Sequence, residues 1–302
     1  MNYYNDIREL IGSTPLLKLN NLGIKNGINV FAKIEGFNPG GSCKDRVGVY
    51  MIEKAEREGI LKPGFTIIEA TAGNTGIGVA LAALNKGYKI IFVVPEKFSI
   101  EKQKLMKSLG AVIINTPKED GMEGAINKAD SLIKEIPNSI SLHQFDNESN
   151  PQAHYDTTGK EIYEDLDGKV DYLVAGAGSG GTFSGALKYL KENIDGVKGI
   201  LADPIGSTMG GGTEGCYKIE GIGNNFIPKT MDMNLVDEII KVNDEEAFNA
   251  SKLLAQKEGL IVGSSSGAAI VATLKFIEKI DSGNVVVILP DRGDRYFSTD
   301  LL

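Results

Sequence analysis

A lysine follows a short glycine-rich run near the start of the chain, in the segment Gly40–Arg46, which reads GGSCKDR. Apolar residues then recur at helical spacing, so Lys44 is expected in the first turn of a helix. Ser42 is the expected N-cap, and Asp45 would complete a capping box. The positive end of the helix dipole favours a neutral amine at Lys44, and a neutral amine is the nucleophile that forms Schiff bases. The alternative is an exposed lysine that only begins a helix.

Two further glycine-rich loops each follow an apolar run and open a helical stretch. They are Thr71–Gly76, which reads TAGNTG, and Gly178–Thr182, which reads GSGGT. In the second loop, consecutive small residues let backbone N–H groups point at one anion, with a helix dipole behind them and the Thr182 hydroxyl as an additional donor. This loop is therefore predicted to bind phosphate, although a tight turn without a ligand has the same composition.

The same region also fits a dinucleotide-binding fingerprint. Gly176–Gly181 matches G-x-G-x-x-G, and Asp203 ends a later apolar run, where an acid that binds a ribose would lie. On its own this pattern indicates an NAD-dependent oxidoreductase. Three observations favour a different cofactor. The fingerprint lies in the middle of the chain, another glycine-rich loop lies upstream of it, and an NAD site would leave Lys44 unexplained.

Taken together, the three segments resemble the fold-type II pyridoxal-phosphate enzymes, in particular the cysteine synthase and cystathionine β-synthase family. The resemblance covers nearly the whole chain and keeps the motifs in one order. The other motifs that carry it are Ile11–Leu16, Gln144–Phe145, Asn150–Pro151, Thr157–Gly159, Glu220–Gly223, Gly263–Gly267 and Asp294–Tyr296.

The resemblance implies that pyridoxal 5′-phosphate is the cofactor and that Lys44 holds it covalently. Asn74 would donate to its phenolic oxygen, and Ser265 would lie beside its pyridine nitrogen. A serine there leaves that nitrogen largely unprotonated, which favours elimination at the β-carbon. From the residues alone, any serine of 264–266 could instead cap the following helix. The residues implied to bind the phosphate are Gly178, Ser179, Gly180, Gly181 and Thr182.

The resemblance also implies an amino-acid substrate and a β-replacement reaction. Lys44 would act as general base, and a serine-type or cysteine-type amino acid would react through an α-aminoacrylate. Thr71 and Asn74 could equally cap the helix that follows them. The residues implied to bind the substrate are Thr71, Ala72, Gly73, Asn74, Thr75, Gln144 and Gly221.

The identity of the two substrates is open. The enzyme could make cysteine from O-acetylserine and sulfide, or release sulfide from cysteine while it forms cystathionine or lanthionine. Many cysteine synthases have serine where this chain has Ala72, and alanine there resembles the bacterial O-acetylserine-dependent cystathionine β-synthases. Asn224 and Asn225 are expected near the pocket entrance, whereas the sequence gives no basis for a catalytic role of Asp232.

A third class of function is a catalytically silent relative that serves as a binding partner. The presence of Lys44, Asn74, Thr182 and Ser265 argues against it. The family resemblance further implies a homodimer and a possible serine acetyltransferase partner. Cys43, beside the lysine, is expected to be a small buried residue that packs the loop.

Composition narrows the remaining classes. The chain has 302 residues and a net charge of −8, which leaves no basic surplus for a nucleic acid or an anionic membrane. Two cysteines form no disulfide framework, and two histidines make a histidine-based metal site improbable. No apolar run has the length of a membrane span and no signal core begins the chain, so a cytoplasmic location is expected.

Apolar runs alternate with helical patterns, which predicts parallel sheets flanked by helices, with ligands at the carboxyl ends of the strands. The expected fold is two three-layer α/β/α domains, tryptophan synthase β-like by the family resemblance. Residues 1–147 and 148–302 would form the domains, with about residues 10–35 crossing to the second. Strands are predicted at 66–69, 89–94, 111–115, 172–175, 199–202 and 285–289, and helices at 76–85, 100–109, 124–134, 183–191 and 268–280.

Overall fold

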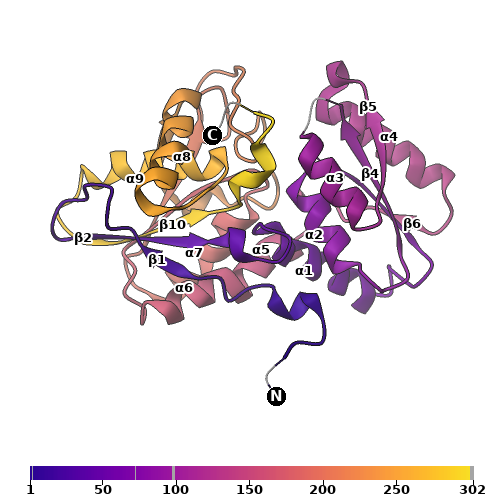
Figure 1. Ribbon diagram of the computed structural model, residues 1–302, viewed down its shortest axis with the longest axis horizontal. Helices are drawn as coiled ribbons and strands as arrows, with labels where there is room; N and C mark the ends of the chain where they lie inside the picture. The colour runs from indigo at the N-terminus through magenta and orange to yellow at the C-terminus, as the bar shows by residue number, and fades with distance from the viewer. Residues whose placement is uncertain (2, 72, 97–98, 300–302) are drawn as a thin grey trace.

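The computed structural model describes residues 1, 3–71, 73–96 and 99–299, and two largely parallel sheets organise them (Figure 1). In the larger sheet only β1 runs antiparallel to its neighbour. Its strands, in spatial order, are β1 (Leu16–Lys18), β2 (Ile28–Ile34), β10 (Gly283–Leu289), β7 (Tyr172–Gly176), β8 (Lys198–Pro204) and β9 (Val236–Val242).

The smaller sheet is wholly parallel and lies to the right in Figure 1. Because parallel strands need long crossover connections, helices separate them along the chain and cover the sheet faces. The strands of this sheet, in spatial order, are β5 (Val112–Thr116), β4 (Lys89–Pro95), β3 (Thr66–Ala70) and β6 (Ser139–Ile140).

Helices cover both faces of each sheet, so each sheet is the middle of three layers. α8 (Asp244–Glu258) and α9 (Ser264–Ile277) lie on one face of the large sheet, and α6 (Lys160–Asp165) and α7 (Gly181–Asn193) on the other. The small sheet packs α1 (Lys44–Arg57), α2 (Asn74–Ala82) and α3 (Ile100–Ser108) on one face and α4 (Gly121–Glu135) on the other. The predicted fold class is confirmed.

All six predicted strands exist, with ends that differ by at most a few residues. The Thr71–Gly76 loop leads into α2, which begins at Asn74 and ends at Ala82. Both ends lie earlier in the chain than those of the predicted helix, 76–85. β1, β2, β6 and β9 were not predicted. β1 and β6 are only three and two residues long, and charged residues interrupt β2 and β9, which pair with β10 and β8 in the assembled sheet.

The early chain joins the large sheet, because β1 and β2 extend it beyond β10. The predicted domain boundary at 147/148 falls between β6 and α5 (Ser149–Ala153) and stays a prediction. After α5 the chain forms one turn of π-helix, η4 (His154–Gly159), before α6. This segment packs on α7, and α5 also packs on α1, so it joins the elements of the two sheets.

Two glycines let α1 and α2 touch backbone to backbone. A β-carbon on Gly48 would come within 3.0 Å of the Gly78 carbonyl, and one on Gly78 would come equally close to the Lys44 carbonyl. Such approaches are closer than real β-carbons make, so only glycine fits. The start of α1, which carries Lys44, is thereby fixed against the helix that follows the TAGNTG loop.

A buried cluster of charged residues ties the first turn of α1, through Arg46, to elements of the large sheet and its helices. The Arg46 guanidinium lies between the carboxylates of Glu35, at 2.8 and 2.9 Å, and Glu161, at 2.5 and 2.8 Å. Lys33 adds a second cation 2.9 Å from Glu161. Burial alone would raise the pKa of Glu161, but its hydrogen bonds and attraction to Arg46, together with Lys33, lower it to about 2.

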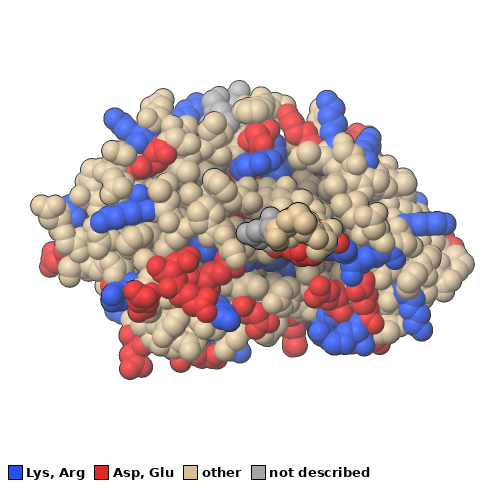
Figure 2. All heavy atoms as spheres, turned by 60° about the horizontal axis from the view of Figure 1, so that its bottom comes forward, with Lys and Arg blue, Asp and Glu red and all other residues tan. Residues whose placement is uncertain are grey.

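On the face shown in Figure 2, acidic side chains form several groups along the lower half of the view, with basic side chains beside them. Within the described residues, no helix is long and apolar enough to cross a bilayer.

The α1–α2 contact is testable by adding one methyl group. Gly78→Ala should lower the free energy of unfolding by about 1–3 kcal/mol, because the helices must separate. Gly215→Ala is the control, since its β-carbon would meet nothing closer than 3.5 Å. Urea unfolding curves of the two variants measure the difference, and equal midpoints would refute the close contact.

The ion cluster predicts a specific acid response. The pKa of Glu161 is depressed in the folded protein, so its stabilising effect is present above its ordinary value of 4.5 and is lost as the pH falls towards 2. Glu161→Gln should therefore destabilise the protein at pH 7, and its difference from wild type should shrink between pH 5 and pH 2. Glu164→Gln, in the same helix but paired only at the surface with Lys160, should change little. Unfolding curves whose separation does not depend on pH would contradict this account.

Candidate active site

The Lys44 loop and the GSGGT loop line one cavity at the carboxyl ends of β7 and β10. This is the edge of a parallel sheet where ligands are expected. Of the predicted site residues, the cavity brings together Lys44, Gly178, Ser179, Gly180, Thr182 and Gly221. The other predicted site residues within the described chain, which are Thr71, Gly73, Asn74, Thr75, Gln144, Gly181 and Ser265, do not line it.

Lys44 is the first residue of α1, as predicted, but the capping differs from the prediction. Cys43 occupies the N-cap position, and the Ser42 hydroxyl accepts from the Lys44 N–H at 3.2 Å. Asp45 does not complete a capping box, because its carboxylate accepts from the Gly40 N–H at 2.5 Å. Burial raises the pKa of Asp45 to about 7, so this loop holds a carboxyl group that titrates near neutrality.

The backbone of the GSGGT loop lies close to neighbouring atoms at three of its glycines. Gly180 has φ +83° and no room for a β-carbon beside Met231. A β-carbon on Gly178 would meet the Gly221 carbonyl, and one on Gly181 would meet the Asn150 amide. α7 begins at Gly181, so the unpaired N–H groups of its first turn and its dipole lie at this loop.

Polar side chains hold the loop from behind. The Asn150 amide donates to the Ser179 hydroxyl at 2.8 Å and to the Gln144 carbonyl at 2.8 Å, which links the loop to the predicted substrate side. Asn224 donates to the Gly178 carbonyl at 2.6 Å, so its side chain supports the loop, whereas the exposed Asn225 contacts Glu214.

The predicted substrate loop holds its shape through Thr71. The Thr71 hydroxyl accepts from the N–H groups of Gly73 and Gly76, both at 3.2 Å, so it caps the start of α2 and keeps its own proton available to donate. Ala72 lies outside the described residues.

Gln144 is oriented by two neighbours. The Thr75 hydroxyl donates to its amide oxygen at 2.6 Å, and the amide nitrogen of Gln144 has no partner among the described residues, so it is available as a donor. The buried carboxylate of Glu69 accepts from Ser141 at 2.6 Å and from the Leu142 N–H at 2.9 Å, and thereby holds the segment that leads to Gln144. Thr75 therefore supports Gln144 and does not itself have a free proton.

Asn74 is held between two buried charged residues, Asp291, which sequence reasoning did not name, and Arg295, which belongs to the Asp294–Tyr296 motif. Its amide nitrogen donates to Asp291 at 2.7 Å, and its amide oxygen accepts from Arg295 at 2.7 Å. Tyr296 also donates to Asp291, at 2.7 Å. The carboxylate needs a donor and the guanidinium needs an acceptor, so the amide has one orientation, with one N–H left over.

The serines at 264–266 do not cap α9, whose N-cap is Gly263. The Ser264 hydroxyl accepts from the Glu220 N–H at 3.0 Å, and the Ser266 hydroxyl is buried with no partner among the described residues. Ser265 lies between them and is buried, so a role beside a cofactor stays a prediction.

Cys43 and Asp232 have structural surroundings. Burial raises the pKa of the Cys43 thiol, so it is not an acidic, reactive thiol. The Asp232 carboxylate accepts from the Asn234 N–H at 3.0 Å, and the Asp232 N–H donates to the hydroxyl of Ser184 in α7 at 2.9 Å. These two bonds hold the turn at Asp232 against α7.

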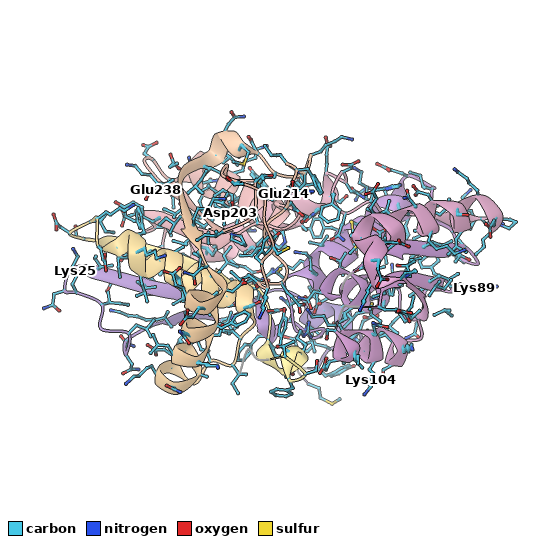
Figure 3. The ribbon with its side chains drawn as sticks, turned by 90° about the horizontal axis from the view of Figure 1, so that it is seen from above. Lys25, Lys89, Lys104, Asp203, Glu214 and Glu238 are labelled. Carbon is cyan, nitrogen blue, oxygen red and sulfur yellow. The ribbon has the colours of Figure 1, made fainter. Side chains whose placement is uncertain are left out.

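Asp203, the residue on which the dinucleotide alternative depends, is occupied. Its carboxylate accepts from the Gly210 N–H at 3.0 Å and pairs with Lys241 at 2.5 Å, and it is 1 % exposed. In Figure 3 it lies in the part of the molecule that also carries Glu214 and Glu238. Both bonds are made to Oδ2 and fold the segment after β8 back on itself, so the carboxylate that the ribose role would need is buried and paired with a cation.

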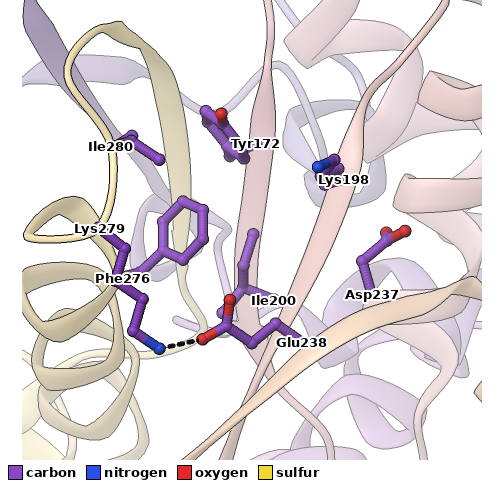
Figure 4. Close-up of a pocket in the computed structure, with 8 residues that line it drawn as sticks. All are labelled: Tyr172, Lys198, Ile200, Asp237, Glu238, Phe276, Lys279 and Ile280. Carbon is purple, nitrogen blue, oxygen red and sulfur yellow. Dashed lines mark hydrogen bonds and ion pairs between the residues drawn. The ribbon is translucent and has the colours of Figure 1, made fainter.

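A second cavity, of about 370 Å³, lies at the opposite edge of the large sheet (Figure 4). Tyr172 and Lys198, which line it, are the first residues of β7 and β8, so it opens at the strand starts. Lys279 and Glu238 pair across its rim. None of the predicted site residues that the structure describes lines it.

The chain matches the family described as "Pyridoxal-phosphate dependent enzyme" over residues 7–291. It is 52% identical to the O-acetylserine-dependent cystathionine β-synthase of Bacillus subtilis, over all of this chain and 98% of the relative. It is 47% identical to a cysteine synthase of Helicobacter pylori, over 97% of this chain and 96% of that protein. The solved structure of the O-acetylserine-dependent cystathionine β-synthase from Helicobacter pylori superposes with a TM-score of 0.95 at 46% identity, over 100% of this chain and 99% of that one.

The residues that line the first cavity fit pyridoxal phosphate, the cofactor of this family. Three glycines whose β-carbons would meet neighbouring atoms keep the loop in its cradle shape, the first turn of α7 supplies N–H donors, and Ser179 and Thr182 supply hydroxyls for a phosphate. Lys44 lines the same cavity, with its amine 3.7 Å from the Cys43 sulfur, where it can meet an aldehyde carbon.

The Asn74 arrangement predicts a spectroscopic effect. Asp291→Asn replaces a charged acceptor by a neutral amide, which accepts the Asn74 N–H more weakly and can also turn its own NH₂ towards Asn74, so the free N–H of Asn74 is less firmly directed. We expect a changed ratio of the visible absorbance bands of the bound cofactor and about a tenfold fall in turnover. Tyr296→Phe is the matched control, since it removes the other hydrogen bond to Asp291 and keeps Asn74 in place. An Asp291→Asn spectrum identical to wild type would contradict the assigned role.

Proposed function

We propose that this chain, which belongs to the pyridoxal-phosphate-dependent enzyme family, catalyses β-replacement on a serine-type or cysteine-type amino acid in sulfur amino-acid metabolism. Pyridoxal 5′-phosphate is its cofactor. The observation that carries the proposal is the placement of Lys44 and the GSGGT loop on one cavity, in a chain that matches the O-acetylserine-dependent cystathionine β-synthase of Bacillus subtilis over 98% of that protein.

When bound, the cofactor withdraws electrons from the α-carbon of the substrate, which makes the α-proton removable and the β-substituent able to leave. The chain would supply the rest. Gly178–Thr182 would bind the phosphate, the free N–H of Asn74 would donate to the phenolic oxygen, and Ser265 would lie beside the pyridine nitrogen.

The substrate carboxylate would be bound without arginine. Thr71 has a hydroxyl proton to donate, and Gln144 has a free amide nitrogen because Thr75 occupies its oxygen. Ala72, Gly73 and Gly221 would complete the predicted substrate site. The Lys44 amine, once free of the cofactor, would remove the α-proton and later return it.

Closure over the substrate would use the contact between α3 and the Glu220–Gly223 segment. Lys102 pairs with Glu220 at 2.7 Å, and its ammonium lies 4.2 Å from the centre of the Tyr296 ring. The Lys102 side chain also covers Gly73, at which a β-carbon would clash with it. This arrangement would exclude water from the reacting atoms.

Two substrate pairs are proposed, and both move sulfur. One is O-acetylserine with sulfide, which gives cysteine and acetate. The other uses a thiol as the second substrate, with cystathionine or lanthionine as product and, from cysteine, sulfide as the leaving group. The 52% identity to a protein described as O-acetylserine-dependent cystathionine β-synthase favours a thiol nucleophile with O-acetylserine as donor.

We also propose a homodimer in the cytoplasm, with the domains divided at residues 147/148. The edge strand β1 and the segment after β2 expose apolar side chains that a second subunit could cover, among them Leu17 and Phe37. A serine acetyltransferase partner is proposed from the family resemblance alone. Light scattering of the purified chain, alone and with that enzyme, tests both assemblies.

The proposed chemistry is tested by the visible absorbance of the purified protein before and after separate additions of O-acetylserine, serine and cysteine. A yellow protein whose main band is replaced by a new one on addition of one amino acid identifies the first substrate, and Lys44→Ala should abolish the change. Sulfide release from cysteine with homocysteine present, followed by product analysis, separates the two substrate pairs. A colourless protein that cannot be reconstituted would refute the proposal and support a catalytically silent relative.

A further inference from the structure

His154 is fully buried, and the described residues offer its ring only hydroxyl partners. Nδ1 lies 2.9 Å from the Thr158 hydroxyl, and Nε2 lies 3.0 Å from the Thr182 hydroxyl. Thr182 stands in the first turn of α7, in the predicted phosphate loop, whereas Thr158 belongs to the π-helical turn η4. The imidazole therefore links the phosphate loop to a segment that no motif assigns a function.

Close helix packing fixes this link. A β-carbon on Gly185 of α7 would lie 2.9 Å from the His154 β-carbon, and one on Gly159 of η4 would lie 2.8 Å from the Ala186 carbonyl. Both glycines are needed for the two segments to approach so closely. The wide π-helical turn, a feature often found at functional sites, sets the position of His154 relative to Thr182.

The ring is neutral. Burial lowers the pKa of His154 to about 3, and the surrounding charges have smaller effects in both directions. These charges are Glu35 and Glu161, which favour the imidazolium, and Lys44 and Arg46, which disfavour it. A neutral imidazole carries one N–H and one lone pair, so its two tautomers give the Thr182 hydroxyl two different tasks.

If Nδ1 carries the proton, Nε2 accepts from Thr182, and the single hydroxyl proton of Thr182 is used up. If Nε2 carries the proton, it donates to Thr182, the Thr158 hydroxyl donates to Nδ1, and the Thr182 proton is free. The Cys43 sulfur, 3.8 Å from the Thr182 oxygen, is a weak acceptor and would not compete with a phosphate oxygen.

We propose that His154 is a positioning residue held as the Nε2–H tautomer, so that Thr158, His154 and Thr182 form a one-way chain of donors that ends on the cofactor phosphate. The inference rests on the proposed function in one respect, the phosphate at Gly178–Thr182. It assigns a task to His154 and Thr158, and it makes the hydroxyl of Thr182 a donor only.

Nitrogen-15 NMR of histidine-labelled holoenzyme tests the tautomer directly. The chain has only two histidines, and His143→Asn assigns their signals. We expect His154 to show a protonated Nε2 and a bare Nδ1 in the protein loaded with pyridoxal 5′-phosphate. A protonated Nδ1, or an imidazolium, in a protein that binds the cofactor would overturn this inference and leave the proposed function intact. Failure to bind the cofactor would overturn both.

Affinity measurements with two probes give an independent test. Thr158→Val should weaken binding of pyridoxal 5′-phosphate about tenfold and leave binding of pyridoxal, which lacks the phosphate, unchanged. Thr158→Ser should restore wild-type affinity. Thr157→Val is the matched control, since its hydroxyl donates to the Ala153 carbonyl and not to the ring. Equal losses for both probes would show a merely structural role and contradict the donor chain.

A double-mutant cycle completes the test. His154→Phe and Thr182→Val should each weaken binding of pyridoxal 5′-phosphate, and the double variant should be little weaker than Thr182→Val alone, because His154 acts through that hydroxyl. Additive losses would contradict the inference.

Discussion

The contact between α1 and α2 at Gly48 and Gly78 is the constraint on which the site depends. It allows the backbone that presents Lys44 to lie directly against the helix that begins at Asn74, and no side chain larger than hydrogen fits between them. The Arg46 cluster holds the same end of α1 towards Glu35 and Glu161. The backbone that carries Lys44 is thus fixed from two sides.

Around this lysine, the structure repeats one physical device. A neutral amide or hydroxyl of the predicted site is oriented by a second residue, which leaves its donor side for the proposed ligand. Thr75 orients Gln144, Asp291 and Arg295 orient Asn74, and His154 is proposed to orient Thr182. Because neutral donors bind anions only when they are correctly directed, the outer residues matter as much as those that would touch the cofactor.

Sequence patterns predicted the parts of this site that depend on local structure. These parts follow from short-range rules: the glycine loops precede helices, Lys44 lies in the first turn of α1, and the six predicted strands exist with slightly different ends, while the roles of the site residues stay predictions. The residues that orient the site could not be found in this way. Glu69, His154 and Asp291 are each far in sequence from the group they hold, and no local pattern distinguishes a buried acid or histidine from a surface one. The capping box at Asp45 was predicted wrongly because Gly40, brought near by the turn, competes for the same carboxylate.

The central claim is that Lys44 carries the cofactor in the cavity closed by the GSGGT loop. The most direct measurement is borohydride reduction of the purified holoenzyme followed by mass spectrometry of its peptides. The account predicts a phosphopyridoxyl group on Lys44 alone. A group on another lysine, or none in a protein that retains the cofactor, would contradict it.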